Sequence, residues 1–451
     1  MVQGPMLIVI LIVAIVFIVL ATTKLKLHPF IALILASYGI ALSCGIPLME
    51  IDKIISKGFG GILAYIGIVI ILGTIIGTIL EKSGAAITMA KTVLKVVGSK
   101  RPALAMSLIG YIVSIPVFCD SGYVILSSLK KSLGKRAKIP AVTMSIALAT
   151  GLYATHTLVP PTPGPIAAAG NLGLSNQLGL VILFGIGISI VTVGVGYVWA
   201  VFGCKNLTCN EDEEDILEEE AIEAKYGILP GQFWAFAPIF IPIILIALAS
   251  AAAFPSHPFG EELFQKIILF LGRPLNALLV GLLFSLKLLP SFSKETLTGW
   301  FEKGLKSAAI IIMITGAGGA LGAVLKATPI GAYLGETLSQ YKMGIFLPFI
   351  IAAALKTAQG SSTVALVTTS ALVAPLLVVL GLDSDIGRVL CVMSIGAGAM
   401  TISHANDSYF WVVSQFSGMD VSTAYRSHTL ATLFQGIATI ITVAILCFFL
   451  T

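Results

Sequence analysis

The residues best suited to chemistry lie in four polar stretches that interrupt the apolar segments of the chain. Two stretches lie in the first half, at 116–122 and 156–165, and two lie in the second half, at 356–362 and 403–408. Hydrocarbon tolerates neither unpaired backbone groups nor isolated charges, so such stretches survive in a membrane only inside protein or around a cavity. Interruptions at corresponding places in two halves of a chain point to the binding site of a transporter.

Two aspartates are candidates for carrying a coupling proton. Asp120 is the charged residue of the stretch 116–122, and Asp407 lies in the fourth stretch. An ionised carboxyl at membrane depth is costly unless it is paired or hydrated, so these side chains are suited to binding and releasing a proton. His156 and His404 stand at corresponding positions of the two halves, and imidazole titrates near neutral pH, so they are further candidates. Helix capping by the aspartates and packing of the histidines in the core are the structural alternatives.

Lys356 is the candidate for holding a negatively charged ligand. A buried cation next to the polar segment 359–362, where backbone amides at the start of a helix lack partners, favours a carboxylate. Gly360 would let the backbone approach that ligand closely. An internal ion pair with Asp120 or Asp407 is the alternative for this lysine. The predicted substrate-binding residues are Ser121, Thr157, Lys356, Gln359, Gly360, Ser361, Ser362, Asn406 and Ser408.

The composition of the chain indicates an integral membrane protein with several spans. Of its 451 residues, 57% are hydrophobic and 11% are charged, whereas a soluble protein has about 25% charged residues. Many apolar runs approach the roughly 20 residues that cross a bilayer as a helix. The net charge of +5 does not indicate a nucleic-acid partner, because the basic residues lie in short loops. No metal site is predicted, since Cys204 and Cys209 lack a second pair of ligands, and the expected coupling ion is a proton or sodium.

The predicted fold class is an all-α polytopic membrane protein built from two inverted repeats. Each repeat comprises five transmembrane spans and one re-entrant hairpin, and an odd number of crossings inverts the second repeat relative to the first. Weak similarity between 73–81 and 318–326 supports the duplication. The predicted boundaries are 1–204 for the first repeat, with its hairpin at 103–129 and its broken span at 141–174, then 205–229 for an acidic cytoplasmic linker, and 230–451 for the second repeat, with its hairpin at 344–380 and its broken span at 387–416.

Lysine and arginine residues orient the chain in the membrane. Basic clusters flank the segment 103–129 on both sides, and the positive-inside rule places both clusters in the cytoplasm, so this segment enters and leaves on the same side. The cluster that follows it, at 130–138, is expected in a cytoplasmic loop. The same reasoning places both termini outside, together with a minority of the basic residues that includes Lys57 and Lys326.

Four pieces of the sequence, at 116–122, 156–165, 358–365 and 406–411, resemble those of a known family. They read Pro-Val-Phe-Cys-Asp-Ser-Gly, His-Thr-Leu-Val-Pro-Pro-Thr-Pro-Gly-Pro, Ala-Gln-Gly-Ser-Ser-Thr-Val-Ala and Asn-Asp-Ser-Tyr-Phe-Trp. The chain resembles the gluconate/proton symporter family, within the superfamily of ion transporters with two re-entrant hairpins, over nearly its whole length. The resemblance implies proton-coupled uptake of a small hydroxy acid such as gluconate. It also implies a homodimer whose transport domain moves like an elevator against a scaffold.

The sequence departs from the family pattern at two places near the expected site. An arginine is expected where Lys356 stands, so a ligand would meet a point charge rather than a bidentate group. Tyr409 replaces a small residue after the Asn-Asp-Ser piece, which narrows the expected pocket.

A sodium-coupled or exchange transporter of another small organic acid, or of an amino acid such as D-serine, is the alternative function. Unwound carbonyl groups together with Asp120 and Asp407 suit Na⁺ as well as they suit a proton. An intramembrane enzyme is not predicted, because the chain contains neither His-Glu-x-x-His nor Gly-x-Gly-Asp. Catalysis also leaves the duplicated layout unexplained.

Overall fold

Helices make up the regular structure of the residues that the computed structural model describes, which are 2–98, 101–210, 227–252, 263–330, 333, 344–404 and 407–451. The first half contains α1 (Met6–Thr23), α2 (Pro29–Ser43), α3 (Leu48–Lys82), α4 (Ala85–Val97), α5 (Pro102–Val113), α6 (Cys119–Ala137), α7 (Ala141–Leu158), α8 (Pro163–Asn171), α9 (Leu178–Val198) and the short η1 (Trp199–Gly203). The all-α fold predicted from the sequence is therefore confirmed for these residues.

The second half has the same character. Its helices are α11 (Gln232–Ala252), α12 (Leu263–Leu271), α13 (Pro274–Ser285), η3 (Leu286–Leu288), η4 (Glu295–Trp300), α14 (Phe301–Lys326), α16 (Phe346–Gln359), α17 (Ser362–Val373), η5 (Ala374–Leu376), α18 (Asp385–Met400), α19 (Ser408–Gln415), α20 (Val421–Ala424), η6 (Tyr425–Thr429) and α21 (Leu430–Leu450). Proline occupies the first position of α5, α8 and α13, where its missing N–H costs nothing and its fixed φ suits a helix.

Each polar stretch lies at a helix boundary. Short connections separate α5 from α6 and α7 from α8, so that Asp120 stands in the first turn of α6. In the second half, α16 ends at Gly360, whose backbone is left-handed with φ 87°, and Ser361 begins α17 by accepting a hydrogen bond from Val364 N at 3.3 Å. A longer irregular connection, which begins at Thr401, separates α18 from α19.

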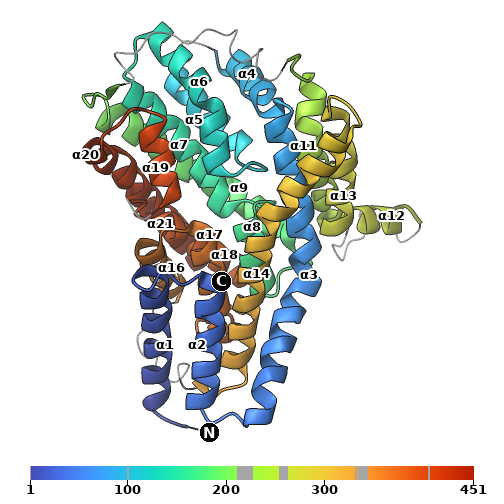
Figure 1. Cartoon of the computed structure of the whole chain (residues 1–451), viewed down its shortest axis with the longest axis vertical. Coiled ribbons are helices and arrows are strands. Elements are labelled where there is room, and N and C mark those ends of the chain that lie inside the picture. The colour runs from blue at the N-terminus through green and yellow to red at the C-terminus, as the bar shows by residue number, and fades with distance from the viewer. Residues whose placement is uncertain are drawn as a thin grey trace.

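The interrupted helix pairs lie at different levels of the molecule. Figure 1 shows α5 and α6 in the upper part and α16 and α17 lower down, beside α18. The long helix α3 packs along α14, α5 packs on α7, and α16 packs on α18. α8 packs on α17, so that the broken helix of the first half meets the interrupted pair of the second half.

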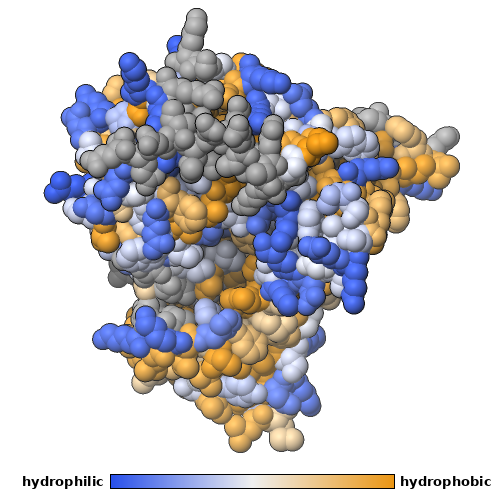
Figure 2. All heavy atoms as spheres, turned by 45° about the horizontal axis from the view of Figure 1, so that its top comes forward, coloured by the Kyte–Doolittle hydropathy of each residue, from blue (hydrophilic) through white to orange (hydrophobic). Residues whose placement is uncertain are grey.

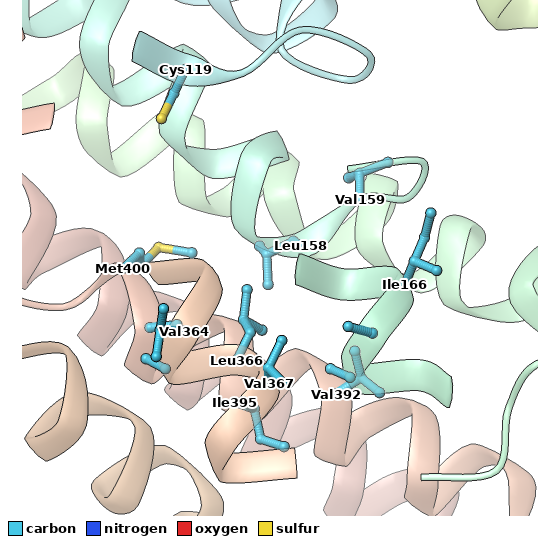
Figure 3. Close-up of a cluster of buried hydrophobic side chains, with 14 of the residues drawn as sticks. Cys119, Leu158, Val159, Ile166, Val364, Leu366, Val367, Val392, Ile395 and Met400 are labelled. Atoms are coloured by element: carbon cyan, nitrogen blue, oxygen red, sulfur yellow. The ribbon is translucent and has the colours of Figure 1, made fainter. Parts of the chain in front are cut away.

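An apolar core fills the space between these two halves. Figure 3 shows Leu158, from the end of α7, close to Leu366 and Val367 of α17, with Ile166 and Val392 on the neighbouring helices. All five side chains are almost completely buried. This core fixes the breaks of the first half relative to those of the second half, because close-packed side chains allow little independent movement.

The outer surface matches a membrane environment. Five described helices are long and apolar enough to cross a bilayer, or seven if each of two bent helix pairs counts as one span. Large apolar side chains such as Ile190, Ile244 and Ile441 are more than half exposed on these helices. In Figure 2 apolar residues dominate the lower part of the visible face, while polar residues gather over the upper end. The total of five spans and one re-entrant hairpin in each half stays a prediction.

One expected loop is wrong. The sequence predicts a cytoplasmic loop for the basic cluster at 130–138, but α6 continues to Ala137 and the exposed fraction of Lys130 is 0%. The Lys130 ammonium donates to Ser145 Oγ of α7 at 3.0 Å and to Ser417 Oγ, just after α19, at 3.2 Å. These oxygen acceptors replace the water that the ammonium loses on burial. Of the predicted acidic linker 205–229, the part 211–226 lies outside the described residues.

The contact between α5 and α7 yields a prediction about stability. A Cβ atom at Gly110 would lie 2.7 Å from both Leu148 O and Leu152 N, which are backbone atoms that cannot move aside. We expect Gly110→Val to lower the free energy of unfolding by about 1–3 kcal/mol through overpacking. The measurement is the thermal unfolding midpoint of the purified protein in detergent. Gly39→Val is the matched control, because a Cβ at this exposed position of α2 meets no atom within 4 Å. Equal midpoints for the two variants would contradict the prediction.

Candidate substrate and proton site

A buried ion pair joins the two interrupted helices of the second half. Lys356 Nζ, in the last turn of α16, lies 2.5 Å from Asp407 Oδ2, and the exposed fractions of the two side chains are 0% and 5%. The same ammonium donates to Gly360 O at 2.5 Å. The structure therefore contains the internal ion pair that the sequence offered as the alternative for Lys356.

Asp407 serves several groups at once. Its Oδ2 also accepts a hydrogen bond from Ser403 Oγ at 2.5 Å, and its Oδ1 accepts one from Tyr409 N at 3.1 Å. The second bond makes Asp407 the N-cap of α19, where a negative charge also suits the positive end of the helix dipole. Each carboxylate oxygen thus has a donor, which is what a buried charge requires.

Ser403 extends this network to α21. Its hydroxyl lies 3.1 Å from His428 Nε2, its backbone N–H donates to Thr432 Oγ1 at 3.0 Å, and its carbonyl accepts from Thr429 Oγ1 at 2.6 Å. His428 is fully buried in η6, directly before α21. This histidine was not among the predicted site residues, although an imidazole at the edge of a long apolar run is the signal that indicates it.

Asp120 occupies a more open position than Asp407. It is partly buried in the first turn of α6, and its Oδ1 accepts a hydrogen bond from the exposed Ser408 Oγ at 3.4 Å. Within the described part of the chain no lysine, arginine or histidine forms an ion pair with Asp120. Ser408 directly follows Asp407 in the chain and also donates to Asp120, so this serine connects the two aspartates. Ser121, the neighbour of Asp120, is also partly exposed. These residues form the open rim of the site, which we define as Asp120, Ser121 and Ser408.

The two predicted histidines have different surroundings. His156 lies in the last turn of α7, where its ring stacks on Tyr153 with centroids 6.3 Å apart and planes inclined by 12°. The Tyr153 ring in turn lies 5.9 Å from Lys356 Nζ. His404 is only partly buried in the connection after α18, and its Nε2 lies 2.8 Å from Thr357 O. His156 is therefore connected to Lys356 through the Tyr153 ring, whereas His404 contacts the backbone of the residue that follows Lys356.

The remaining predicted substrate-binding residues are mostly buried or already hydrogen-bonded within the protein. Thr157 is fully buried and donates to Tyr153 O of its own helix at 3.1 Å. Ser361 caps α17, and Ser362 is 8% exposed in its first turn. Asn406 lies outside the described residues, as does the side chain of Gln359.

The sequence pattern of the GntP family permeases matches residues 6–449. The chain belongs to this family. An uncharacterized permease of Haemophilus influenzae is 36% identical over 91% of this chain and 86% of the relative. A gluconate permease of Pseudomonas aeruginosa is 32% identical over 92% of each chain. The D-serine transporter DsdX of Escherichia coli is 31% identical over 95% of each chain. The GntP protein described here is thus an integral membrane transporter and not an enzyme, and the family resemblance drawn from the sequence is confirmed.

Solved structures of transporters share the fold of this GntP permease. MtrF of Neisseria gonorrhoeae, described as one of a class of antimetabolite efflux pumps, aligns with a TM-score of 0.64 and 15% identity over 95% of this chain and 96% of that chain. The Alcanivorax borkumensis YdaH transporter aligns with a TM-score of 0.62 and 14% identity over 94% and 98%. At these identities the likeness concerns the fold alone.

The buried ion pair yields a second prediction. Lys356→Met or Asp407→Leu alone leaves a buried charge without its partner, which we expect to lower the free energy of unfolding by about 3–5 kcal/mol. The double variant removes both charges and should recover most of that loss, since apolar groups of similar size often replace a buried pair at little cost. Thermal unfolding of the four proteins in detergent completes the double-mutant cycle. Additive losses in the double variant would show that the two side chains do not depend on each other.

Proposed function

We propose that this GntP permease imports gluconate or a related small hydroxy acid together with protons. The observation that carries this proposal is the buried pair of Lys356 and Asp407 beside the open rim, where the interrupted helices of both halves meet. Because the Lys356 ammonium already binds the Asp407 carboxylate, the carboxylate of a substrate can bind the same ammonium in its place. The gluconate permease among the relatives supports this substrate class.

The charges of the site explain why protonation would favour binding of an anionic substrate. The ion pair is neutral, so the Asp120 carboxylate leaves the site with an excess negative charge that repels an anionic substrate. A proton on Asp120 removes this repulsion. A proton on Asp407 also weakens its hold on Lys356, which then becomes free for the substrate. In the proposed complex the hydroxyls of Ser121 and Ser408 contact hydroxyl groups of the sugar acid.

We also propose that the interrupted helices move as one unit against a scaffold of α1–α3 and α11–α14, in two inverted repeats with both termini outside and within a homodimer. The placement of the α5–α6 and α16–α17 pairs at different levels supports this arrangement. The glycines of α3 support it as well. A Cβ at Gly77 would lie 2.5 Å from Pro116 O, and one at Gly73 would lie 3.2 Å from Pro161 O. Without side chains at Gly73 and Gly77, the connections of the first half pack directly on the backbone of α3, and we propose that they slide there.

Sodium-coupled transport, or transport of an amino acid such as D-serine, is the second candidate function. The specific observation that favours it is the open rim, where Asp120 forms no ion pair among the described residues. A sodium ion or the ammonium group of an amino acid would supply the missing positive charge. The D-serine transporter among the relatives belongs to the same family.

Uptake into proteoliposomes tests the coupling. With an inward proton gradient and no sodium, labelled gluconate should accumulate, and a protonophore should abolish the accumulation. We expect Asp120→Asn to reduce proton-driven accumulation at least about ten-fold, which corresponds to about 1.4 kcal/mol. Exchange of gluconate across the membrane without a gradient should persist in this variant.

The outcomes of that assay separate the candidates. Full proton-driven accumulation in both Asp120→Asn and Asp407→Asn would refute the proton assignment. Accumulation that requires sodium at every pH would establish the sodium-coupled alternative. Uptake of D-serine in preference to gluconate would replace the substrate class. Thr368→Val, a buried position on α17 away from the ion pair, serves as a control for the effect of reconstitution.

The glycine surface of α3 gives a test of the proposed movement. In Gly77→Ala the added methyl group meets Pro116 O in the arrangement that the structure shows, and an overpacking cost of about 1–3 kcal/mol at this contact should change the rate of translocation roughly five-fold or more. The affinity of the detergent-purified protein for gluconate should stay unchanged. Gly67→Ala on the same helix is the control, because the nearest atom to its Cβ is Leu63 Cβ at 3.8 Å. Equal uptake rates in the two variants would argue against sliding at this surface.

A further inference from the structure

A second cavity lies apart from the ion pair, between α3 and α14 on one side and α8 and α17 on the other. Its volume is about 220 Å³, and it opens to solvent. The lining residues that matter here are Lys57 and Gly61 of α3, Asn171 of α8, Gly322 and Lys326 of α14, and Ala371 of α17. The lining combines two lysines with small residues, which is the composition of a space that stays open and carries positive charge.

The two lysines make the cavity attractive to anions. Lys57 and Lys326 both reach solvent, and among the described residues no carboxylate lies within ion-pair distance of either ammonium. Two positive charges without local compensation raise the concentration of small anions in a concave space. Asn171 fixes one wall instead of binding a ligand, because its amide nitrogen donates to Val367 O at 3.2 Å and to Ser370 Oγ at 2.9 Å.

Glycines explain both the closeness of the helices and the open space beside them. A Cβ at Gly58 would lie 2.5 Å from Ala323 Cβ, so α3 and α14 touch there. One turn further along α3, a Cβ at Gly61 would meet no atom within 4 Å, and at Gly322 it would make only ordinary contacts with Ala371. The cavity therefore has room for a ligand where the helices diverge.

The position of the cavity connects it with the proposed substrate site. α17 begins at Ser362, two residues after the carbonyl that Lys356 contacts, and Ala371 of the same helix lines the cavity. Nine residues of helix span roughly 14 Å. The sequence places Lys57 and Lys326 on the outer side of the membrane, so an anion that arrives from outside would meet them before it reaches Lys356.

We propose that this cavity is a vestibule that weakly binds small carboxylates and concentrates them at the seam between α3–α14 and α8–α17. The proposal rests on the proposed function for the identity of the substrate, but the vestibule itself is defined by its two lysines. It recognises the negative charge of the ligand and not its hydroxyl groups. Ser362, at the start of α17 near the buried pair, and Ala371, in the vestibule, lie roughly 14 Å apart along the helix.

A cysteine placed in the vestibule tests its charge without any transport assay. Gly61→Cys faces the open space, and we compare its rates of labelling by an anionic, sulfonate-bearing methanethiosulfonate and by a cationic, trimethylammonium-bearing one. Gly299→Cys is the matched control, since its Cβ also meets no atom within 4 Å and the residue lies in η4, at the opposite end of α14 from Lys326. The parent chain gives the background from its six native cysteines.

The expected result is a fall in the anionic-to-cationic rate ratio when the lysines are neutralised. Lys57→Gln with Lys326→Gln should lower this ratio roughly three- to ten-fold in the Gly61→Cys variant at low ionic strength, and should leave it unchanged in the Gly299→Cys variant. Molar salt should abolish the difference, because the screening length falls from about 10 Å at 0.1 M to about 3 Å at 1 M. An unchanged ratio in the Gly61→Cys variant would overturn the proposal.

Uptake kinetics test the consequence for transport. In proteoliposomes at low ionic strength, Lys57→Gln and Lys326→Gln should each raise the KM for gluconate severalfold and leave kcat near the parent value. Lys294→Gln, an exposed lysine directly before η4 at the opposite end of α14 from Lys326, is the matched control and should behave as the parent does. A parent protein that transports no gluconate would refute the proposed substrate, while the labelling ratio would still decide whether the vestibule exists. A changed labelling ratio with unchanged KM would refute its role in delivering substrate.

Discussion

The ion pair between Lys356 and Asp407 is the interaction on which the arrangement of the interrupted helices depends. Two charges removed from water are stable only when further donors and acceptors replace the lost hydration. Gly360 supplies a carbonyl to the lysine because a left-handed backbone ends α16 at that residue. Ser403 and the N–H of Tyr409 supply donors to the aspartate because the chain is irregular before α19. The breaks and the charges therefore require each other: each break supplies the polar groups that its neighbouring charge needs.

The division of the site into a buried pair and an open rim suggests how members of the family could select among different small acids. The relatives named as gluconate and D-serine transporters have similar identities to this chain. Substrates of both kinds carry a carboxylate, which is the group that the buried lysine suits. Their other groups differ, and the open rim of Asp120, Ser121 and Ser408 is the part of the proposed site that faces outward. In this reading, selectivity among small acids resides in the rim, while the pair serves the feature that the substrates share.

The sequence allowed prediction of the breaks because proline, glycine and charge are costly inside apolar helices wherever they occur. Lys356 and Asp407 were singled out for the same reason. Their pairing was left open, since it depends on the packing of α16 against α18. Lys130 was misplaced because the positive-inside rule counts charges and ignores helical phase, which turns this lysine inward toward α7. His156 and His404 match in sequence, yet α7 continues past the first whereas α18 ends at Met400, before the second. The hydrogen bond of His428 to Ser403 arises between segments distant in the chain.

The short helix α19 is held by buried charges of opposite sign at its two ends. Asp407 caps its first turn, and Lys130 donates to the carbonyl of Phe416 at its last turn, at 3.4 Å. Both charges complement the dipole of the peptide units between them. α19 therefore links the ion pair to Lys130 in the middle of α6. Loss of the charge on Asp407 would remove the favourable interaction at the start of α19 and leave the one at its other end, two helical turns away. The stability of this short helix is thereby tied to the charge of the ion pair.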